Sequence, residues 1–372
     1  MKPEERARLS QLLAIESLVT LAGQIAGVFS IVFLVRSAIP VQETSLFYFE
    51  AFIVTTVACL LAFRIGMKRP RLWMAGAMAS LCCFYLSFIF LSGRALLFIA
   101  PIFFAPYIVG FWVPFNVLYM EQTTKENRGF VSCVVFLVFP VIGVFSPLLG
   151  AYIATSVAYW VIFFCAALAL FINIFLIMLG SATKSMPFRP KLTIGKLRKR
   201  LSTALFFEGA QEGVFYTATP LLAMQFASGE MALGTLFALF ALAGGLASLW
   251  VGRVSDRKGE RALYVKAGAA LTAPFILVAA FAPSLQVYTV ANSVVNVALT
   301  LVPIFLFALA MDRMEDDKPS AVLTRELLLN SGRALGTGVV VVILFALGGS
   351  AFAISIAYAV AAAMIIGTAV VK

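Results

Sequence analysis

Apolar runs of about 20 residues recur along the whole chain and are separated only by short polar connections. A helix of that length rises about 30 Å, which is enough to cross the hydrocarbon core of a bilayer. In lipid, every backbone N–H and C=O group must be satisfied internally, and a helix does this within one segment. The pattern therefore predicts an all-α membrane protein with many spans.

Composition and length set the number of spans. Hydrophobic residues make up 62% of the 372 positions and charged residues 12%, a balance that a soluble core with a polar coat does not reach. Twelve spans would use about 31 residues each with their connections, which leaves no room for a soluble domain. The predicted spans are 11–36, 45–64, 72–92, 94–119, 129–153, 155–180, 202–226, 231–251, 263–282, 287–311, 326–348 and 350–371.

One long polar stretch, residues 181–200, divides these spans six and six. It carries Lys184, Arg189, Lys191, Lys196, Arg198, Lys199 and Arg200. The predicted domains are therefore a six-helix bundle over 1–180, a cytoplasmic linker over 181–200 and a second six-helix bundle over 201–372. Weak internal matches at an offset of about 191 residues, such as 118–122 with 309–313, indicate that the halves are parallel repeats.

The basic residues predict the orientation. Of 28 Lys and Arg residues, only Arg36, Arg94 and Arg333 fall outside the termini and the connections on the N-terminal side of the membrane. Cytoplasmic loops carry such an excess of basic residues, so both termini are expected in the cytoplasm and the protein in the cell membrane. The net charge of +11 is likewise explained by membrane orientation. It does not indicate nucleic-acid binding, because the basic residues are dispersed among short loops.

The strongest local motif is the second loop motif, residues 252–261, which follows the eighth span. Gly252 and Gly259 permit a tight turn, and Asp256 can complement the positive end of a neighbouring helix. Arg257 and Arg261 are its basic members. This segment resembles the G-x-x-x-D-R-x-G-R-R loop of the major facilitator superfamily, which implies the twelve-helix fold of that family.

The resemblance implies that Asp256 holds a cytoplasmic gate closed against span five, which begins near Arg128. The equivalent first loop motif, residues 64–73, keeps the basic turn but has Met67 near the expected Asp, so we expect an asymmetric gate. Gly143, Pro147 and Gly150 in span five resemble the G-x-x-x-G-P-x-x-G-G motif of the exporters and antiporters in this family, with two departures at Ser146 and Ala151. An ordinary helix bend explains them as well. Segments 207–213 and 325–333 resemble a largely uncharacterised prokaryotic subgroup.

Charged residues inside apolar spans are costly and mark functional sites by default. Glu16 lies about 8 Å into span one and Glu208 about 9 Å into span seven, at matching positions of the two repeats. Glu212 and Tyr216 follow Glu208 at intervals of four residues and share its face. The predicted substrate and proton surface contains Glu208, Gln211, Glu212, Tyr216, Glu16, Gln24, Asn330 and Arg333.

These carboxylates could take up and release a proton as access alternates, with Arg333 as a counter-charge, or they could form static ion pairs that hold helices together. For Glu16, closer to the headgroups, the static role is favoured. Near the outer surface, Glu50 and Arg36 are expected to form a structural or outer-gate pair, with Glu43 taking part.

The preferred hypothesis is a secondary active transporter that works by alternating access, with proton-coupled export of a small amphipathic or hydrophobic compound, that is, an efflux antiporter. The alternatives are an uptake symporter or uniporter for a sugar, amino acid or organic acid, a lipid flippase, and a non-transporting receptor or scaffold. The expected partners are a small-molecule substrate, protons and membrane lipids, with no nucleic acid, and the chain is expected to be a monomer.

Enzymatic chemistry is not expected. The chain has no His, its 5 Cys residues lie in apolar runs, and no nucleophile and base arrangement stands out. No nucleotide-binding loop of the GxxxxGK[ST] type occurs, which argues against an ATP-driven pump. We therefore expect no catalytic residues, no metal site and no cofactor.

Overall fold

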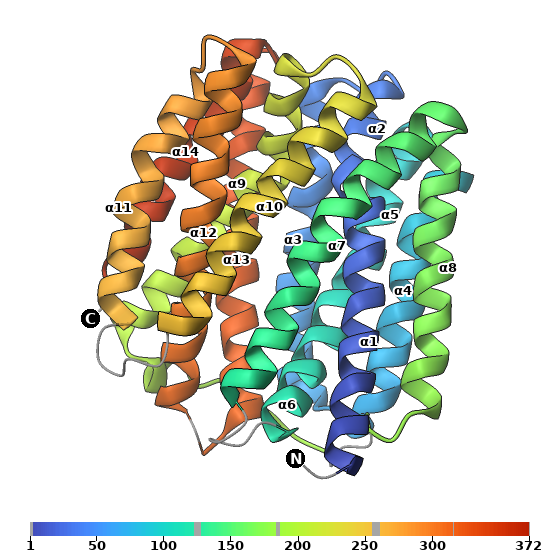
Figure 1. Ribbon diagram of the computed structural model, residues 1–372, viewed down its shortest axis with the longest axis vertical. Helices are drawn as coiled ribbons and strands as arrows, with labels where there is room; N and C mark the ends of the chain where they lie inside the picture. The colour runs from blue at the N-terminus through green and yellow to red at the C-terminus, as the bar shows by residue number, and fades with distance from the viewer. Residues whose placement is uncertain (1–2, 123–127, 184–186, 255–260, 315, 372) are drawn as a thin grey trace.

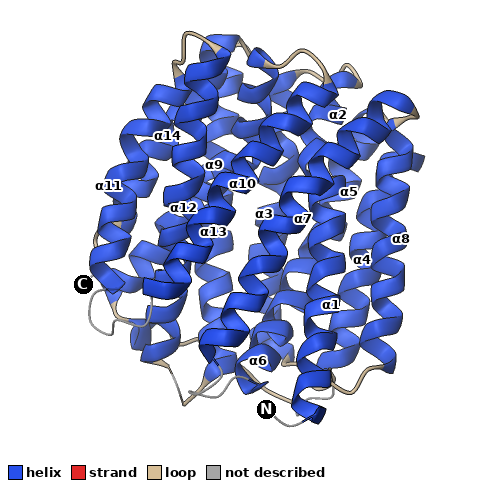
Figure 2. Ribbon diagram, in the orientation of Figure 1, coloured by secondary structure: helices blue, strands red, loops and turns tan. Residues whose placement is uncertain are grey.

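The computed structural model describes residues 3–122, 128–183, 187–254, 261–314 and 316–371. Inside these ranges, the side chains of 3–5, 122, 128–140, 248–254 and 300–301 lie outside the description. The described chain is a bundle of long helices that run roughly along one axis, and both ends of the chain lie toward the lower side of Figure 1. Helices account for nearly all of it (Figure 2). In the described ranges, the only extended pairing is a bridge between Met67 and Phe188.

The first six predicted spans correspond to ten elements. They are α1 (Pro3–Ile25), η1 (Gly27–Phe29), α2 (Ser30–Arg36), α3 (Val41–Ile65), α4 (Pro70–Phe90), α5 (Gly93–Tyr107), η2 (Ile108–Trp112), α6 (Val113–Gln122), α7 (Arg128–Ser156) and α8 (Tyr159–Leu179). Spans one and four are each built from three consecutive elements.

The linker holds a short 3₁₀ turn, and six helices follow it. These elements are η3 (Ile194–Leu197), α9 (Lys199–Phe226), α10 (Glu230–Val254), α11 (Arg261–Ala280), α12 (Leu285–Arg313), α13 (Lys318–Ala346) and α14 (Ala351–Thr368). Ten helical segments among the described residues are long and apolar enough to cross a membrane. With α7 and α9 they account for the twelve predicted spans, and the polar stripe of α9 explains why it is not among those ten.

Span one bends near its middle for a local reason. Ala26 departs from helical geometry with φ −121° and ψ −38°, and η1 follows it. Gly27 lies so close to the Tyr85 hydroxyl of α4 that an added Cβ would sit 3.3 Å from it. At the bend, the Ala26 carbonyl accepts two hydrogen bonds, one from the Phe29 backbone N–H at 3.1 Å and one from the Ser30 side chain at 3.4 Å.

Span four is irregular because of proline. Pro101 and Pro106 lie inside α5, and a π-helical turn, η2, follows directly. Proline removes a backbone donor and clashes with the preceding turn, so a wider turn can absorb the mismatch. Gly110 in η2 then packs against the Trp73 carbonyl and Ala77 of α4.

The two predicted halves meet along two seams. Helix α3 packs against α13 along its length, and α7 packs against α10. At the second seam, an added Cβ on Gly143 would lie 3.1 Å from Ala241, and one on Gly234 would meet Ala151 and the Pro147 carbonyl. Small residues let these backbones approach closely, which is how helices associate in lipid.

Candidate functional site

The backbones of helices α9 and α13 are in direct contact, because each helix has glycines on the side that faces the other. A Cβ on Gly209 would overlap the Leu329 backbone, and one on Gly213 would overlap the backbone of Arg333. From the other side, Gly332 faces the Phe206 carbonyl and Gly336 the Ala210 carbonyl. This close approach brings the charged side chains of the two helices within reach of each other.

The first ion pair lies deep between these helices. The Arg325 guanidinium donates to Glu208 Oε1 at 3.2 Å and to Glu326 Oε1 at 3.0 Å. The Glu208 side chain is 1% exposed and that of Glu326 6%. Glu208 Oε2 and Arg325 Nε have no hydrogen-bond partner in the described part of the chain.

The second ion pair lies two turns further along α13. Arg333 Nε donates to Glu212 Oε2 at 2.7 Å, and its Nη1 donates to Asn330 Oδ1 at 3.0 Å. Asn330 Nδ2 in turn donates to the Glu326 carbonyl at 2.7 Å. The contacts therefore join both ion pairs into one α9–α13 charge network, made of Glu208, Glu212, Arg325, Glu326, Asn330 and Arg333.

The charges of this network do not balance. It holds three carboxylates, those of Glu208, Glu212 and Glu326, against two guanidinium groups. Fully ionised, it carries one surplus negative charge in a region shielded from water, where an uncompensated charge is costly. One bound proton or one cationic ligand would neutralise it.

Aromatic side chains of α3 and α12 border this network. The Arg333 guanidinium lies over the Phe52 ring of α3 at 5.8 Å, and Arg325 lies over Phe307 at 5.1 Å. Tyr216, one turn beyond Glu212, has ring centroids 5.1 Å from those of both Tyr48 and Phe52. Even so, Tyr216 remains 37% exposed and the Glu212 side chain 26%, so both reach accessible space where α9 faces α3.

The repeat partner of Glu208 has a different environment. Glu16 on α1 is 3% exposed, and neither its Oε2 nor Thr20 Oγ1 one turn later has a hydrogen-bond partner among the described residues. At the predicted repeat offset of about 191, Arg325 corresponds to Val134 in span five, so the repeat does not place a basic residue at that position. Gln24 is half-buried further along α1, and Gln211 is buried on α9.

The second loop motif is only partly described. Asp256, Arg257 and Gly259 lie outside the described residues, as do the side chains of Gly252 and Arg128. Arg261, the first residue of α11, forms an ion pair with Asp312 near the end of α12. This contact joins two helices of the C-terminal half, so the described part of the motif bonds within that half.

The first loop motif has an apolar contact at its centre. Met67 is fully buried, and its backbone exchanges hydrogen bonds with Phe188 of the linker at 2.9 and 3.2 Å. Its side chain belongs to a hydrophobic cluster that includes Cys59 of α3 and Leu323 of α13. At the position where the resemblance implies an acidic residue, this chain therefore packs a methionine between α3, α13 and the linker.

The span-five residues make close helix contacts on two sides. Gly143 faces Ala241 of α10, and Gly150 lies against the Ile25 carbonyl, at the point where span one bends. Pro147 lies beside Gly234 of α10. These residues thus connect the bend in span one to the seam between α7 and α10.

At the opposite end of the bundle, one expected ion pair is wrong. Arg36 does not bond Glu50 or Glu43; its Nε donates to Glu230 of α10 at 3.1 Å and its Nη2 to the Ser228 carbonyl at 2.7 Å. Tyr159 also donates to Glu230, at 3.0 Å, and Glu43 bonds Arg94 at 3.3 Å. Arg36 ends α2 and Glu230 begins α10, so the packing of the two helices brings these side chains together.

Comparison with known proteins decides the family. The sequence profile described as Major Facilitator Superfamily matches residues 12–337. The chain belongs to the major facilitator superfamily. No curated protein matches the sequence.

Solved structures of the superfamily share this fold across nearly the full chain. The human organic anion transporter MFSD10 (TETRAN) is 17% identical with a TM-score of 0.67, covering 99% of this chain and 100% of its own. A bacterial homologue of the human lysosomal transporter Spinster, in an inward-facing and occupied conformation, is 14% identical with a TM-score of 0.67, covering 99% and 96%. A bacterial homologue of the iron transporter ferroportin is 16% identical with a TM-score of 0.64, covering 97% and 98%. At these identities the likeness shows the fold.

Two members of the charge network, Arg325 and Glu326, are missing from the predicted site. The predicted span began at residue 326, which left Arg325 in the loop, whereas α13 begins at Lys318 after an N-cap in which Asp317 accepts from the Ser320 backbone. Arg325 therefore lies about 10 Å inside the helix at 1.5 Å per residue. The Asp-Lys-Pro-Ser sequence at 317–320 carries that start signal, because Asp is a favoured N-cap and Pro is favoured in the first turn.

Proposed function

We propose that this protein is a proton-coupled secondary transporter that exports a small amphipathic or hydrophobic compound by alternating access. The observation that carries the proposal is the surplus carboxylate of the α9–α13 charge network, together with the unpaired Glu208 Oε2. A proton on this network removes the surplus charge, and its release restores it. Such a site can exchange one proton for one positive charge on a substrate.

The charge balance also favours one class of substrate. Both guanidinium groups are already bonded to carboxylates, so neither is free to hold an anion. The accessible flank of the network presents Glu212 beside Tyr216, Tyr48 and Phe52, which suits a cation with an aromatic or apolar body. MFSD10, an organic anion transporter by name, shares the fold with this chain, but the surplus charge here supports a cationic or neutral substrate.

The argument for export in exchange for protons comes from span five. Gly143, Pro147 and Gly150 lie between the bend of span one and α10, so this span can couple a change at the seam to a change at the bend. The resemblance of these residues to the exporter and antiporter motif supports the same direction of transport.

Proton exchange can be measured with a lipophilic cation as the probe. In everted membrane vesicles acidified by respiration, addition of ethidium should release protons through the wild-type protein and raise the fluorescence of a pH-sensitive dye. Glu208→Gln should abolish this release. Glu43→Gln, which alters a pair with Arg94 far from the network, is the matched control and should retain it.

The same Glu208→Gln variant should fold normally, because it leaves two carboxylates against two guanidinium groups. Its melting temperature in detergent should be equal to or above that of the wild type. Proton release by Glu208→Gln at the wild-type rate for every cationic or neutral compound that the protein transports would contradict the proposal.

A further inference from the structure

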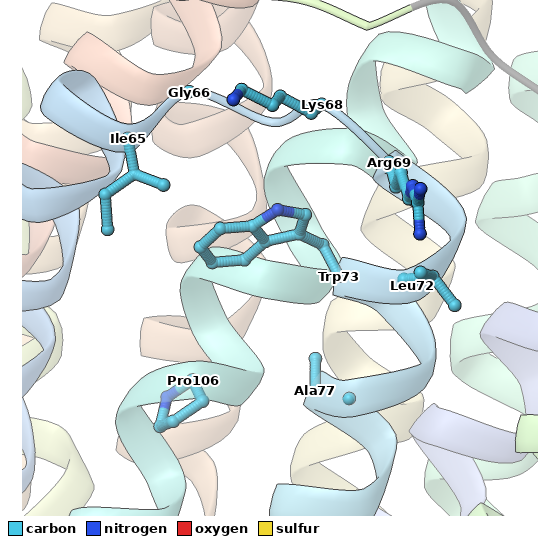
Figure 3. A pocket seen from close by; sticks show the side chains of 9 residues that line it. Ile65, Gly66, Lys68, Arg69, Leu72, Trp73, Ala77 and Pro106 are labelled. Atoms are coloured by element: carbon cyan, nitrogen blue, oxygen red, sulfur yellow. The ribbon is translucent and has the colours of Figure 1, made fainter.

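A recess on the flank of the bundle lies next to the first loop motif, at the end of the molecule that the basic residues predict to be cytoplasmic. It has a volume of about 590 Å³ and lies between the end of α3, the start of α4 and α5. Figure 3 shows its lining, which consists of Ile65, Gly66, Lys68, Arg69, Leu72, Trp73, Gly76, Ala77 and Pro106. The volume is within the range of about 300–1,000 Å³ found for ligand sites.

The recess is polar at one end and apolar along the rest. Lys68 and Arg69 lie on the loop that forms its rim, while Trp73 crosses its middle and Ala77 and Pro106 lie at the far end (Figure 3). Along α4, the distance from Pro70 to Ala77 is about 10 Å at 1.5 Å per residue. The cationic rim matches the phosphate headgroup of a phospholipid, and the apolar groove below it matches the upper part of an acyl chain.

The two rim cations have no partner of their own in the described part of the chain. Lys68 and Arg69 are exposed, and none of the nine lining residues is acidic. Their neighbour Arg71 behaves differently, because its guanidinium donates to Thr183 Oγ1 at 3.1 Å and to the Met178 carbonyl at 3.2 Å. The fold thus satisfies one cation of this turn and leaves two facing the recess.

The groove is also open toward the outside of the bundle along part of its length. Ile65 is 56% exposed and Leu72 46%, and the position of Gly76 has no heavy atom within 4 Å of an added Cβ. We propose that this recess binds an anionic phospholipid of the cytoplasmic leaflet, with its phosphate between Lys68 and Arg69 and an acyl chain along Trp73. Basic pockets at the cytoplasmic ends of helices hold anionic headgroups in this way.

The binding can be tested through Trp73 itself and does not depend on transport. The chain has 4 Trp residues, so a variant that keeps only Trp73 (W112F, W160F and W250F) reports on the recess. In vesicles of phosphatidylcholine, brominated phosphatidylglycerol should quench this Trp at a mole fraction about tenfold lower than brominated phosphatidylcholine does, since two basic residues act together. A variant that keeps only Trp160, 54% exposed at the other end of the bundle, should be quenched equally by both lipids.

Charge variants separate the recess from general surface attraction. In the Trp73-only protein, K68Q/R69Q should remove the preference for phosphatidylglycerol. The control K199Q/R200Q removes the same number of charges from the exposed start of α9, at the same end of the bundle, and should keep that preference. Gly76→Leu fills the groove and should also reduce the preference. Equal quenching of the Trp73-only protein by the two brominated lipids, or equal loss of preference in both double variants, would overturn the proposal.

Discussion

At the residue scale, the property that distinguishes this chain is the imbalance of charge between α9 and α13. Three carboxylates share two guanidinium groups, and the side chains involved are at most 26% exposed. Burying such groups is costly unless each is paired, so removing different members should have opposite effects on stability. Removing a carboxylate relieves the surplus, whereas removing a guanidinium increases it.

The pair of Arg333 with Glu212 gives a direct test of this idea. Arg333→Gln should lower the free energy of unfolding by about 3 kcal/mol, because it leaves Glu212 without its counter-charge. The double variant Glu212→Gln with Arg333→Gln should recover most of that loss. Thermal unfolding of the purified protein in detergent measures both.

The exposed pair of Arg94 with Glu43 is the matched control for this test. The Arg94 side chain is 78% exposed, so Arg94→Gln should cost less than about 1 kcal/mol. A double variant at Glu212 and Arg333 that is no more stable than Arg333→Gln alone would show that the two side chains do not stabilise each other.

At the scale of elements, glycine determines which helices can meet closely. Gly209 and Gly213 on α9 lie against the backbone of α13, and Gly332 and Gly336 on α13 lie against the backbone of α9, with no space for a Cβ at any of the four. Without that approach, side chains of Arg length would have to bridge a wider gap, and the network would be open to water. The close helix contact therefore holds the charged side chains in place and excludes water from them.

Two Gly→Ala changes should differ clearly in their effect on stability. Gly332→Ala places a Cβ against the Phe206 carbonyl and the Ala210 backbone, neither of which can move aside, so a loss of about 2 kcal/mol is expected. Gly23→Ala on α1 meets no atom within 4 Å and should be neutral or stabilising, because Ala favours the helix.

Melting temperatures of the two purified variants give the comparison. If Gly332→Ala melted at or above the wild-type temperature, the close contact of α9 with α13 would be wrong.

At the scale of the whole molecule, contacts between the predicted halves and the linker lie at both ends of the bundle. At the end that holds the termini, Met67 and the linker join α3 to α13, and Lys191 donates from its backbone to Ser320 at 2.8 Å. At the other end, Arg36 reaches from α2 to Glu230 and the Ser228 carbonyl. In the proposed alternating-access cycle, each of these contacts would break in turn.

The Arg36 contact can be tested by distance measurement across the halves. The Arg36 side chain is 41% exposed, so the pair contributes about 0.5–1 kcal/mol. If the proposed cycle opens this end, Arg36→Ala should shift the equilibrium toward the open state about two- to fivefold. Spin labels at Ser37 and Gly229 should then show a larger population at long distance in electron paramagnetic resonance.

Arg94→Ala is the control, because it removes a pair at the same end that lies inside one predicted half. An Arg36→Ala distance distribution identical to that of Arg94→Ala would mean that Arg36 does not hold the two predicted halves together at this end.

The sequence alone determined the class of fold, because a bilayer admits only long apolar helices and their number follows from the chain length. It also identified Glu208, Glu212 and Arg333, since a charge inside an apolar run is visible without any structure. The tertiary structure decided the partners. Arg325 joined the site because α13 starts eight residues before the predicted span, at Lys318, and Arg36 bonded Glu230 instead of Glu43. Pairing depends on how each helix is rotated about its axis and how closely two backbones approach, which only the packing of the whole bundle fixes.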